Sequence, residues 1–518
     1  MNRLDPKNKN PDPSMWVDEA IWGHRLYDEQ TPWFIYLEFM NVYCYARSQG
    51  TIFQEADYNT LSYVPAHRLY LRNILFNYPL TKMEQICKKT SGEAQQWDTW
   101  IKEMEESQQG LVNPDFSYLK KHFETFAEFV EVIKVLHSTS LEMTSNKRWT
   151  SKFVFPYCPE ALYEDLDKKA RTNDRRFFGR TGELLYLILC RAANNPELSD
   201  LIEKRLFQHE TVWNTVIKCL QPGDEALPKE KEGGFLPYES HYLFDELAND
   251  WISVLKLDIP PYDLIPHLVT ITGFHMMRYQ QQISREVLGE SRTSYFIAEI
   301  VAPKKTMVRE LSVESYQENN VLSTKAIDKY ISDIENSDEW QNALLGSDPY
   351  SLCYNILRQK VLWPRKEKDY EGFKDPSDLL AAFRETARRR HSQHISNIHR
   401  VYGREIGLVS KRGTNRLRYA PTDAFIKTLV LSTVEKRMEL EQFLQKLSGK
   451  YGLVLGSVEA ERYSNLVSCD FDKKAFQGNS ERLEQRLSSI GLLKRLSDGC
   501  AYVINPFSTL GQPSVDLS

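Results

Sequence analysis

Apolar residues recur at spacings of three and four along most of the chain, which is the period of an amphipathic α-helix. The clearest example is 123–133, where Phe, Val and Ile alternate with Glu in this spacing. Two denser runs, 33–45 and 182–190, have so few polar positions that they predict helices buried on nearly every side. Similar helical patterns occupy 239–255 and 265–288. The pattern therefore predicts a mainly α-helical protein.

Breaks in this pattern suggest how the chain is organised. Gly and Pro together make up 46 of 518 residues, a low share that also favours helices. The main break is 222–237, where charged residues mix with Pro and Gly in a composition typical of a linker or mobile loop. The predicted parts are an N-terminal α-helical domain (1–221), this linker (222–237), a second α-helical region (238–374), a basic helix and connector (375–420), a C-terminal module (421–507) and a disordered tail (508–518).

Positive charge is concentrated near the C-terminus. The whole chain has a net charge of −5, but 381–420 contains ten Lys and Arg against two Glu, which is +8 and leaves −13 for the rest. A basic face on an otherwise acidic chain can neutralise phosphates and release their counterions. A solvated face, or a dock for an acidic protein, stays open as the alternative. The predicted nucleic-acid contacts are Arg384, Arg388, Arg389, Arg390, Arg400, Arg404, Lys411, Arg412, Arg416 and Arg418.

The same segment contains three histidines, which raises the question of a metal site. His394 and His399 would lie about 140° apart around a helix, so they and His391 do not converge on one ion. The eight cysteines of the chain are widely spaced and form no C-x-x-C pair. We therefore expect free thiols, no metal and no cofactor.

The C-terminal module has a pattern of its own. Asp498-Gly499 lies between two apolar runs, which is a strong signal for a tight β-hairpin. Amphipathic spacing precedes it in three blocks. The predicted elements, in order, are helices over 421–437, 438–450 and 480–490 and strands over 492–496 and 500–505.

Three helices followed by a β-hairpin resemble the winged-helix family of helix-turn-helix modules. The resemblance implies that the third helix enters the major groove and that the hairpin wing touches the DNA backbone. One departure is 457–478, which is longer than the family's turn between the second and third helices. Many winged helices bind proteins, so that alternative stays open. The contacts that the resemblance implies are Arg482, Gln485, Arg486 and Ser489 on the helix and Lys494 and Arg495 on the wing.

A smaller basic cluster lies in the N-terminal half, interleaved with Phe177 and Phe178. Cations beside aromatic rings suit single-stranded nucleic acid, but nearby acidic residues equally suit an internal salt-bridge network. The cluster consists of Lys168, Lys169, Arg171, Arg175, Arg176 and Arg180.

Catalytic motifs are scarce. The sequence contains no P-loop, no dinucleotide-binding glycine motif, no H-E-x-x-H and no G-x-S-x-G. Asp167 and Lys169 fit the D-x-K of metal nucleases, with Glu160 or Glu164 upstream, and Asp472 begins a second such triplet. Chance alone produces several such triplets in a chain this rich in Asp, Glu and Lys.

These observations lead to one main hypothesis. No apolar run is long enough for a membrane span, and the N-terminus has no secretory signal, so we expect a cytoplasmic protein with no membrane contact. We expect a non-enzymatic accessory or scaffold subunit that holds duplex DNA and works with other protein subunits, such as an ATPase or a nuclease. A motif-free helical body with a basic C-terminal part looks like accessory subunits of bacterial phage-defence or DNA-processing systems. The alternatives are a metal-dependent nuclease centred on Asp167 and Lys169, and a pure protein–protein scaffold.

Overall fold

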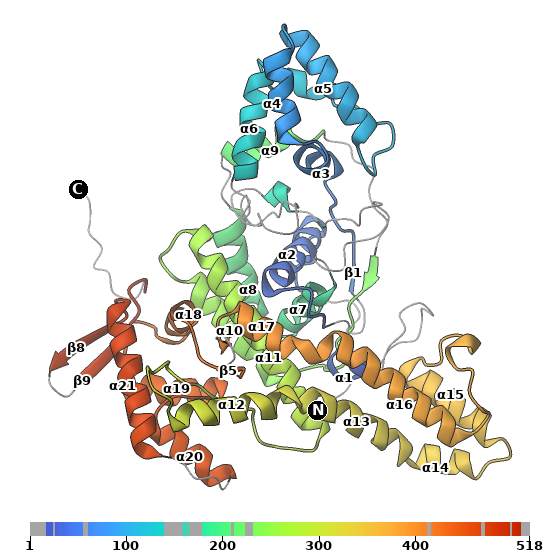
Figure 1. Cartoon of the computed structure of the whole chain (residues 1–518), viewed down its shortest axis with the longest axis vertical. Helices are drawn as coiled ribbons and strands as arrows, with labels where there is room; N and C mark the ends of the chain where they lie inside the picture. The colour runs from blue at the N-terminus through green and yellow to red at the C-terminus, as the bar shows by residue number, and fades with distance from the viewer. Residues whose placement is uncertain are drawn as a thin grey trace.

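The computed structural model confirms a mainly α-helical protein with small sheets near its C-terminal end (Figure 1). Helices form a central body, a lobe at one end of the long axis, and a second lobe at the side. The structure describes residues 17–23, 26–54, 61–138, 159–162, 164, 179–208, 212–222, 231–411, 416–467, 472–497 and 500–508.

The central body is built around α2 (Pro32–Gln49), α7 (Thr181–Cys190) and α11 (Pro261–Val287). The two dense apolar runs of the sequence form α2 and α7, which are largely buried as the sequence predicts, and these helices pack against each other. Gly182 makes this possible, because an added Cβ there would lie 2.6 Å from the Cβ of Glu38. The other helices of the body are α1 (Val17–Trp22), α8 (Asn195–Ile202), α10 (Tyr242–Leu255) and α12 (Met307–Asn320), with a π-helical turn at Glu203–Phe207.

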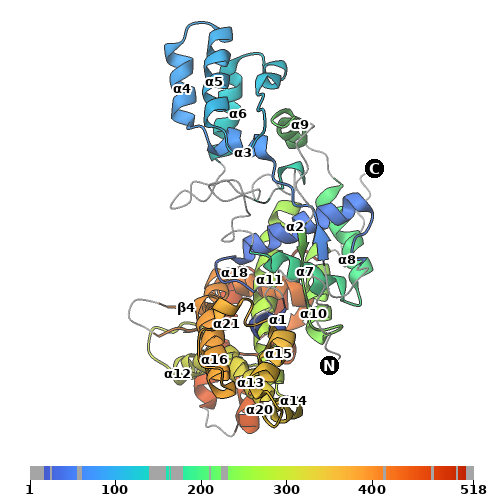
Figure 2. The same ribbon diagram turned by 90° about the vertical axis from the view of Figure 1, so that its right-hand side faces the viewer.

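The end lobe has its own hydrophobic core, in which Trp97, Trp100 and Phe129 are buried. These rings contact one another mostly edge to face, an arrangement that aromatic pairs favour. Figure 2 shows this lobe standing clear of the central body. Its elements are α3 (Leu69–Phe76), α4 (Leu80–Lys89), α5 (Glu93–Ser107), a 3-10 turn (Ser117–Lys121), α6 (Phe126–Ser138) and α9 (Val212–Cys219), with another 3-10 turn at Pro159–Ala161.

The side lobe contains the first half of the predicted basic helix. Asp375 caps α16 (Pro376–Gln393), since its carboxylate accepts from the backbone N–H groups of Ser377 and Asp378. Apolar residues at helical spacing, from Leu379 to Tyr402, are buried. The other elements of this lobe are α13 (Leu322–Glu335), α14 (Asp338–Leu344), α15 (Pro349–Val361) and two 3-10 turns (Glu367–Asp369, Ile395–Asn397).

Part of the predicted linker 222–237 is built into the body instead. Strand β2 (Lys231–Gly233) pairs antiparallel with β1 (Leu61–Tyr63), and Phe235 and Leu236 that follow it are buried. The two apolar side chains therefore anchor a segment whose composition looked mobile.

The C-terminal module contains three helices that precede an antiparallel hairpin. They are α18 (Asp423–Thr433), α19 (Leu440–Tyr451) and α21 (Lys473–Ser489), and the hairpin is β8 (Leu493–Ser497) and β9 (Cys500–Ile504). The first helix ends earlier than predicted because the chain enters β6 (Arg437–Glu439), which pairs with β9 to give the sheet order β6-β9-β8.

Two further elements in this module differ from the prediction. The long stretch between the second and third helices holds α20 (Ser457–Val467), and α21 begins at Lys473 because Asp472 caps it. Strand β7 (Leu453–Val454) pairs in parallel with β3 (Phe296–Ile297), and Phe274 of α11 lies in the module's core. The module is thus packed directly onto the body.

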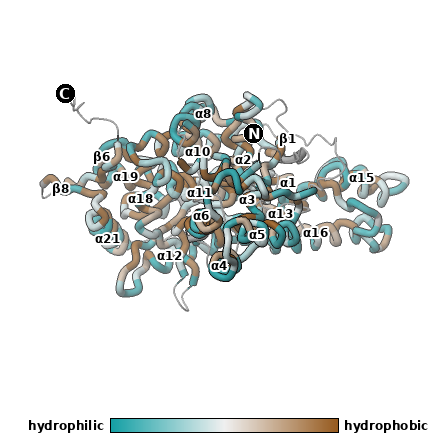
Figure 3. The backbone as a smooth tube through the Cα atoms, turned by 90° about the horizontal axis from the view of Figure 1, so that it is seen from above, coloured by the Kyte–Doolittle hydropathy of each residue, from teal (hydrophilic) through white to brown (hydrophobic). Residues whose placement is uncertain are grey.

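Figure 3 shows hydrophobic and hydrophilic residues alternating along the outer helices, as amphipathic helices require. Within the described part of the chain, no helix combines the length and the apolar character that crossing a membrane requires. The six described cysteines are free thiols, as predicted.

Candidate nucleic-acid interface

The cations of α16 are mostly engaged with the protein's own carboxylates. Arg384 lies 2.8 Å from Glu335, and Arg388 lies 2.7 Å from Asp328. Both acids belong to α13, so these pairs join α16 to its neighbour within the side lobe. Arg389 is exposed and has no partner among the described residues. Of these predicted phosphate contacts, Arg384 and Arg388 thus have a structural role.

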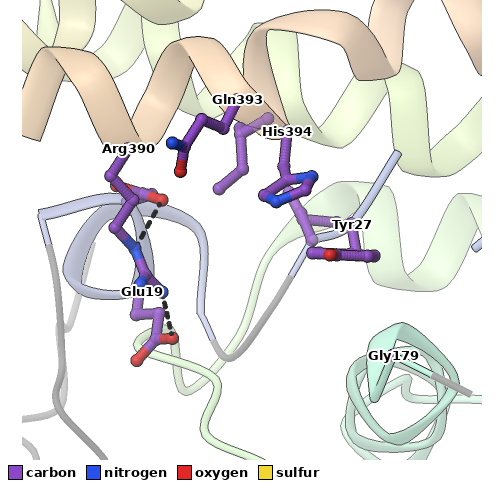
Figure 4. Close-up of a pocket in the computed structure, with 9 residues that line it drawn as sticks. Glu19, Tyr27, Gly179, Arg390, Gln393 and His394 are labelled. Carbon is purple, nitrogen blue, oxygen red and sulfur yellow. Dashed lines mark hydrogen bonds and ion pairs between the residues drawn. The ribbon is translucent and has the colours of Figure 1, made fainter. Parts of the chain in front are cut away.

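Arg390 is also engaged with the protein's own carboxylates, in a pocket between α1 and α16 (Figure 4). Its guanidinium lies 3.1 Å from the carboxylate of Glu19 and 3.5 Å from that of Asp18. Both carboxylates are buried, and burial raises the pKa of Asp18. In the same pocket the ring of His394 lies against Tyr27, with the two ring centroids 4.1 Å apart. Arg390 therefore compensates buried acids, contrary to its predicted role as a phosphate contact.

Arg418 is the clearest correction to the predicted set. It lies on β5 (Arg418–Tyr419), where its side chain is 2 % exposed and its Nε lies 2.6 Å from the buried carboxylate of Glu299. Arg309 of α12 binds the other oxygen of Glu299 at 2.9 Å. One carboxylate thus holds two arginines inside the protein, and Arg418 is inaccessible to a ligand.

Arg412 lies outside the described residues, and the other four cations of the segment lie on the surface. Arg400 and Arg404 are one turn apart on α17 (Ile398–Glu405), while Lys411 directly follows β4 (Val409–Ser410) and Arg416 lies two residues before β5, which pairs with β4. All four side chains are exposed, and none has a carboxylate partner among the described residues. We call these four residues the hairpin surface.

Close packing fixes α17 against the β4–β5 hairpin. Gly403 lies inside α17, and an added Cβ there would lie 2.5 Å from Val409. The carbonyl of Gly403 accepts from the N–H of Leu408 at 2.9 Å, and the hydroxyl of Tyr419 lies 2.7 Å from Nε2 of His399. These contacts bring the helix cations and the hairpin cations together on one part of the surface.

The structure adds a lysine that sequence reasoning missed. Lys304 is exposed and lies two residues after Ala302, whose carbonyl accepts from Arg309 at 3.1 Å. Arg309 and Arg418 share Glu299, so Arg416 is two residues from this buried cluster, and Lys304 is two residues from the carbonyl that Arg309 binds. The segment from Pro303 to Thr306 gave no signal, because the contact that places it spans more than 100 residues of sequence.

The predicted contacts on α21 divide into two groups. Gln485 and Ser489 are exposed, as expected for an outward face. Arg482 instead donates to the carbonyl of Ile300 at 3.0 Å, and Arg486 binds the carboxylate of Asp423 at 2.8 Å from its Nε. The two arginines lie on the flank beside the buried core residues of the helix, so they attach it to the rest of the protein.

The β8–β9 hairpin carries its predicted cations on the surface. Lys494 is exposed, and it pairs across the sheet with Tyr502. Arg495 is exposed to 62 % and lies 2.9 Å from Glu484 of α21. This exposed pair joins β8 to α21.

The three histidines have separate surroundings. His391 lies 3.1 Å from the hydroxyl of Ser323, and His399 lies between Gln281 and Tyr419. Burial lowers the pKa of His391 to about 4 and that of His399 to about 3. Within the described ranges, no three His, Cys, Asp or Glu side chains are grouped as metal ligands would be.

Most of the second basic cluster lies outside the described residues: Lys168, Lys169, Arg171, Arg175 and Arg176. Its last member, Arg180, is largely buried and pairs with Glu183 at 3.0 Å. This pair is of the kind that the internal salt-bridge alternative predicts.

The residues of the nuclease alternative are only partly described, since Asp167 and Lys169 fall outside the described ranges. Glu164 accepts from the hydroxyl of Tyr63 at 2.5 Å. The Asp472 triplet is explained by its role as the N-cap of α21.

One comparison with known proteins places the chain near a family. Residues 360–506 match the family model of methylation-associated defense system protein MAD7. The match begins in α15 and spans α16, α17, the β4–β5 hairpin and the C-terminal module, so it includes the whole hairpin surface. No curated protein and no solved structure shows significant similarity to the chain. The family match supports the resemblance to defence-system proteins.

Proposed function

We propose that this chain is a non-enzymatic subunit of a methylation-associated defence system and that it binds duplex DNA through phosphate contacts. The observation that carries the proposal is the hairpin surface, where four exposed cations stand together without carboxylate partners among the described residues. Three of the four are arginines, and a guanidinium group can bind two phosphate oxygens at once. The only acidic residue of α17 is Glu405, at its last position.

The surroundings of this surface favour a duplex over a single strand. Proteins that hold single strands stack the bases on exposed aromatic rings. The tyrosines nearest the hairpin surface, Tyr316, Tyr402 and Tyr419, are all buried. Cations without an aromatic platform suit the regular phosphate backbone of a double helix.

We also propose that the C-terminal module is a winged helix. Support comes from the order of α18, α19 and α21 before the β8–β9 hairpin, with α20 inserted between the second and third helices. The exposed Gln485 and Ser489 on α21 and Lys494 on the wing are where such a module contacts DNA.

Fluorescence anisotropy with a labelled duplex across a salt series tests the proposal. Changing Arg400 and Arg404 together to Ala should weaken binding to all sequences and lower the slope of log affinity against log salt by about 1.8, or 0.9 for each lost phosphate contact. The matched control changes Arg384 and Arg388 to Ala, which removes the same charge from ion-paired positions. An equal effect of both double variants would contradict a specific role for the hairpin surface.

A specific observation also favours the scaffold alternative. Leu345 and Phe373, at the end of the side lobe, are 87 % and 81 % exposed, which suits contact with another protein. Pull-down with nuclease treatment and mass spectrometry tests for partner subunits such as an ATPase or a nuclease. If the protein binds no duplex DNA, or if its affinity for duplex DNA does not fall as salt rises, the scaffold function would be the one that remains.

Magnesium-dependent cleavage of DNA that is lost in Asp167→Ala would instead support the nuclease.

A further inference from the structure

The exposed face of α21 lies between two sides of the helix, and each side contacts a different part of the protein. Arg482 and Glu484 are two positions apart, so their side chains point about 160° away from each other around the helix. Arg482 donates to the carbonyl of Ile300, while Glu484 pairs with Arg495 of the wing. Between these two directions lie the exposed side chains of the outward face, which are Lys474, Gln477, Glu481, Gln485, Ser488 and Ser489.

The β4–β5 hairpin lies on the Arg482 flank. Ile300 is next to Glu299, which binds Arg418 of β5, so one short segment contacts both α21 and the hairpin. Helix α12 likewise contacts both α21 and β5. Figure 1 shows the same order, with the wing on one side of α21 and with α12 and β5 on the other. Figure 2 shows β4 at the outer edge of the molecule, beside α12.

We propose that the β4–β5 hairpin is a second DNA-binding arm, placed across α21 from the wing, so that one duplex contacts both arms at once. Lys411 and Arg416 are the cations of the hairpin arm, and Lys494 and Arg495 are those of the wing arm. This inference rests on the proposed duplex binding and adds the layout of the contact. Each arm meets the phosphate backbone on its own side of the helix, and the two footprints lie on either side of α21.

The arrangement has a consequence for the length of duplex that the protein needs. The shortest duplexes reach only α21, a longer one also reaches one arm, and a duplex longer than about one turn (about 10 base pairs) can extend to both arms. Because each arm adds phosphate contacts, affinity and salt dependence should rise in two steps as the duplex lengthens.

The experiment measures affinity for duplexes from about half a turn to about two turns, corrected for the number of binding registers, with the full-length chain. The hairpin-arm variant changes Lys411 and Arg416 to Ala, and the wing-arm variant changes Lys494 and Arg495 to Ala. Each variant should lose one of the two steps and reach its plateau at a shorter duplex than the parent. The salt slope on long duplexes should fall by about 1.8 in the hairpin-arm variant and by about 0.9 in the wing-arm variant, because Arg495 is already paired with Glu484. The combined variant should lose both steps.

Three results would overturn the two-arm layout. The first is a hairpin-arm variant with the parent's length dependence. The second is a combined variant whose affinity for duplex DNA is no lower than that of the weaker-binding single variant, which would mean that both pairs of cations act at one place. The third is a parent chain that binds no duplex, and this result alone also contradicts the proposed function. Circular dichroism spectra and melting curves that match the parent's would show that the alanine variants fold.

Discussion

The guanidinium of Arg418 lies 2.6 Å from the carboxylate of Glu299, and both side chains are almost wholly removed from water. The second oxygen of Glu299 binds Arg309 at 2.9 Å. A buried ion pair costs little only while both partners are present, since an unpaired charge in the interior has lost its hydration without compensation. This cluster joins the hairpin to the segment that contacts α21, so the geometry of the proposed interface depends on it.

We therefore expect Glu299→Gln to destabilise the protein by about 3 kcal/mol, because it leaves Arg418 buried beside a neutral amide. Urea unfolding followed by circular dichroism measures the loss, and hydrogen exchange should locate it at β5 and the segment after β3. Glu335→Gln is the control, since its pair with Arg384 is partly exposed and should contribute less than about 1 kcal/mol. Equal losses in the two variants would show that the Glu299 cluster is no stronger than a surface pair.

A pair of glycines tests the packing of the central body. An added Cβ at Gly182 would lie 2.7 Å from the carbonyl oxygen of Ile35, whereas at Gly449 in α19 it would meet nothing within 4 Å. Gly182→Ala should therefore destabilise the protein by about 1–3 kcal/mol through overpacking. Gly449→Ala should stabilise it by about 0.5–1 kcal/mol, because alanine is the better helix former. Thermal melts of both variants check the opposite signs, and a shift in the same direction would refute the packing argument.

Local signals in the sequence predicted much of the fold. The spacing of Leu379, Phe383 and Ala387 predicts a buried helix face, and Asp375 before a proline predicts its N-cap; both predictions are confirmed. The hairpin signal at Asp498-Gly499 likewise lies between two strands, β8 and β9, that pair with each other. Each of these features depends on residues close together in the chain, where periodicity and capping act.

The candidate site was harder to predict because its contacts are distant in sequence. Charge alone could not separate Arg418, which is paired with Glu299 across 119 residues, from the exposed Arg416 two positions earlier. Strands β4 and β5 have two residues each, too short for an alternating pattern. The position of Lys304 near the Glu299 cluster depends on contacts that its neighbours make. The early start of α21 did have a local signal, since Asp472 is a good N-cap residue.

The division of α21 predicts different roles for two neighbouring residues. Arg486→Ala should lower stability by about 1 kcal/mol, because Arg486 bonds to Asp423 and to the carbonyl of Pro421, while DNA affinity and base preference stay unchanged. Gln485→Ala should leave stability unchanged and alter any base preference, since its exposed amide can pair with a base edge. Competition binding with duplexes of different sequence, beside melting curves, separates the two effects. A change of preference in Arg486→Ala would mean that its side chain leaves Asp423 when DNA binds.

The buried histidines make stability depend on pH. The folded protein holds His399 with a pKa of about 3, so between about pH 3 and 6.5 the unfolded chain binds a proton that the folded chain does not. The contribution of this neutral histidine is complete above about pH 6.5, and it is lost as the pH falls, by about 1.4 kcal/mol for each pH unit. His399→Gln should reduce this slope of unfolding free energy against pH by the same amount between pH 4 and 6. The control is His122→Gln, because His122 is exposed on the end lobe. Urea unfolding at a series of pH values measures both slopes, and an unchanged slope in His399→Gln would mean that His399 is already protonated in the folded protein.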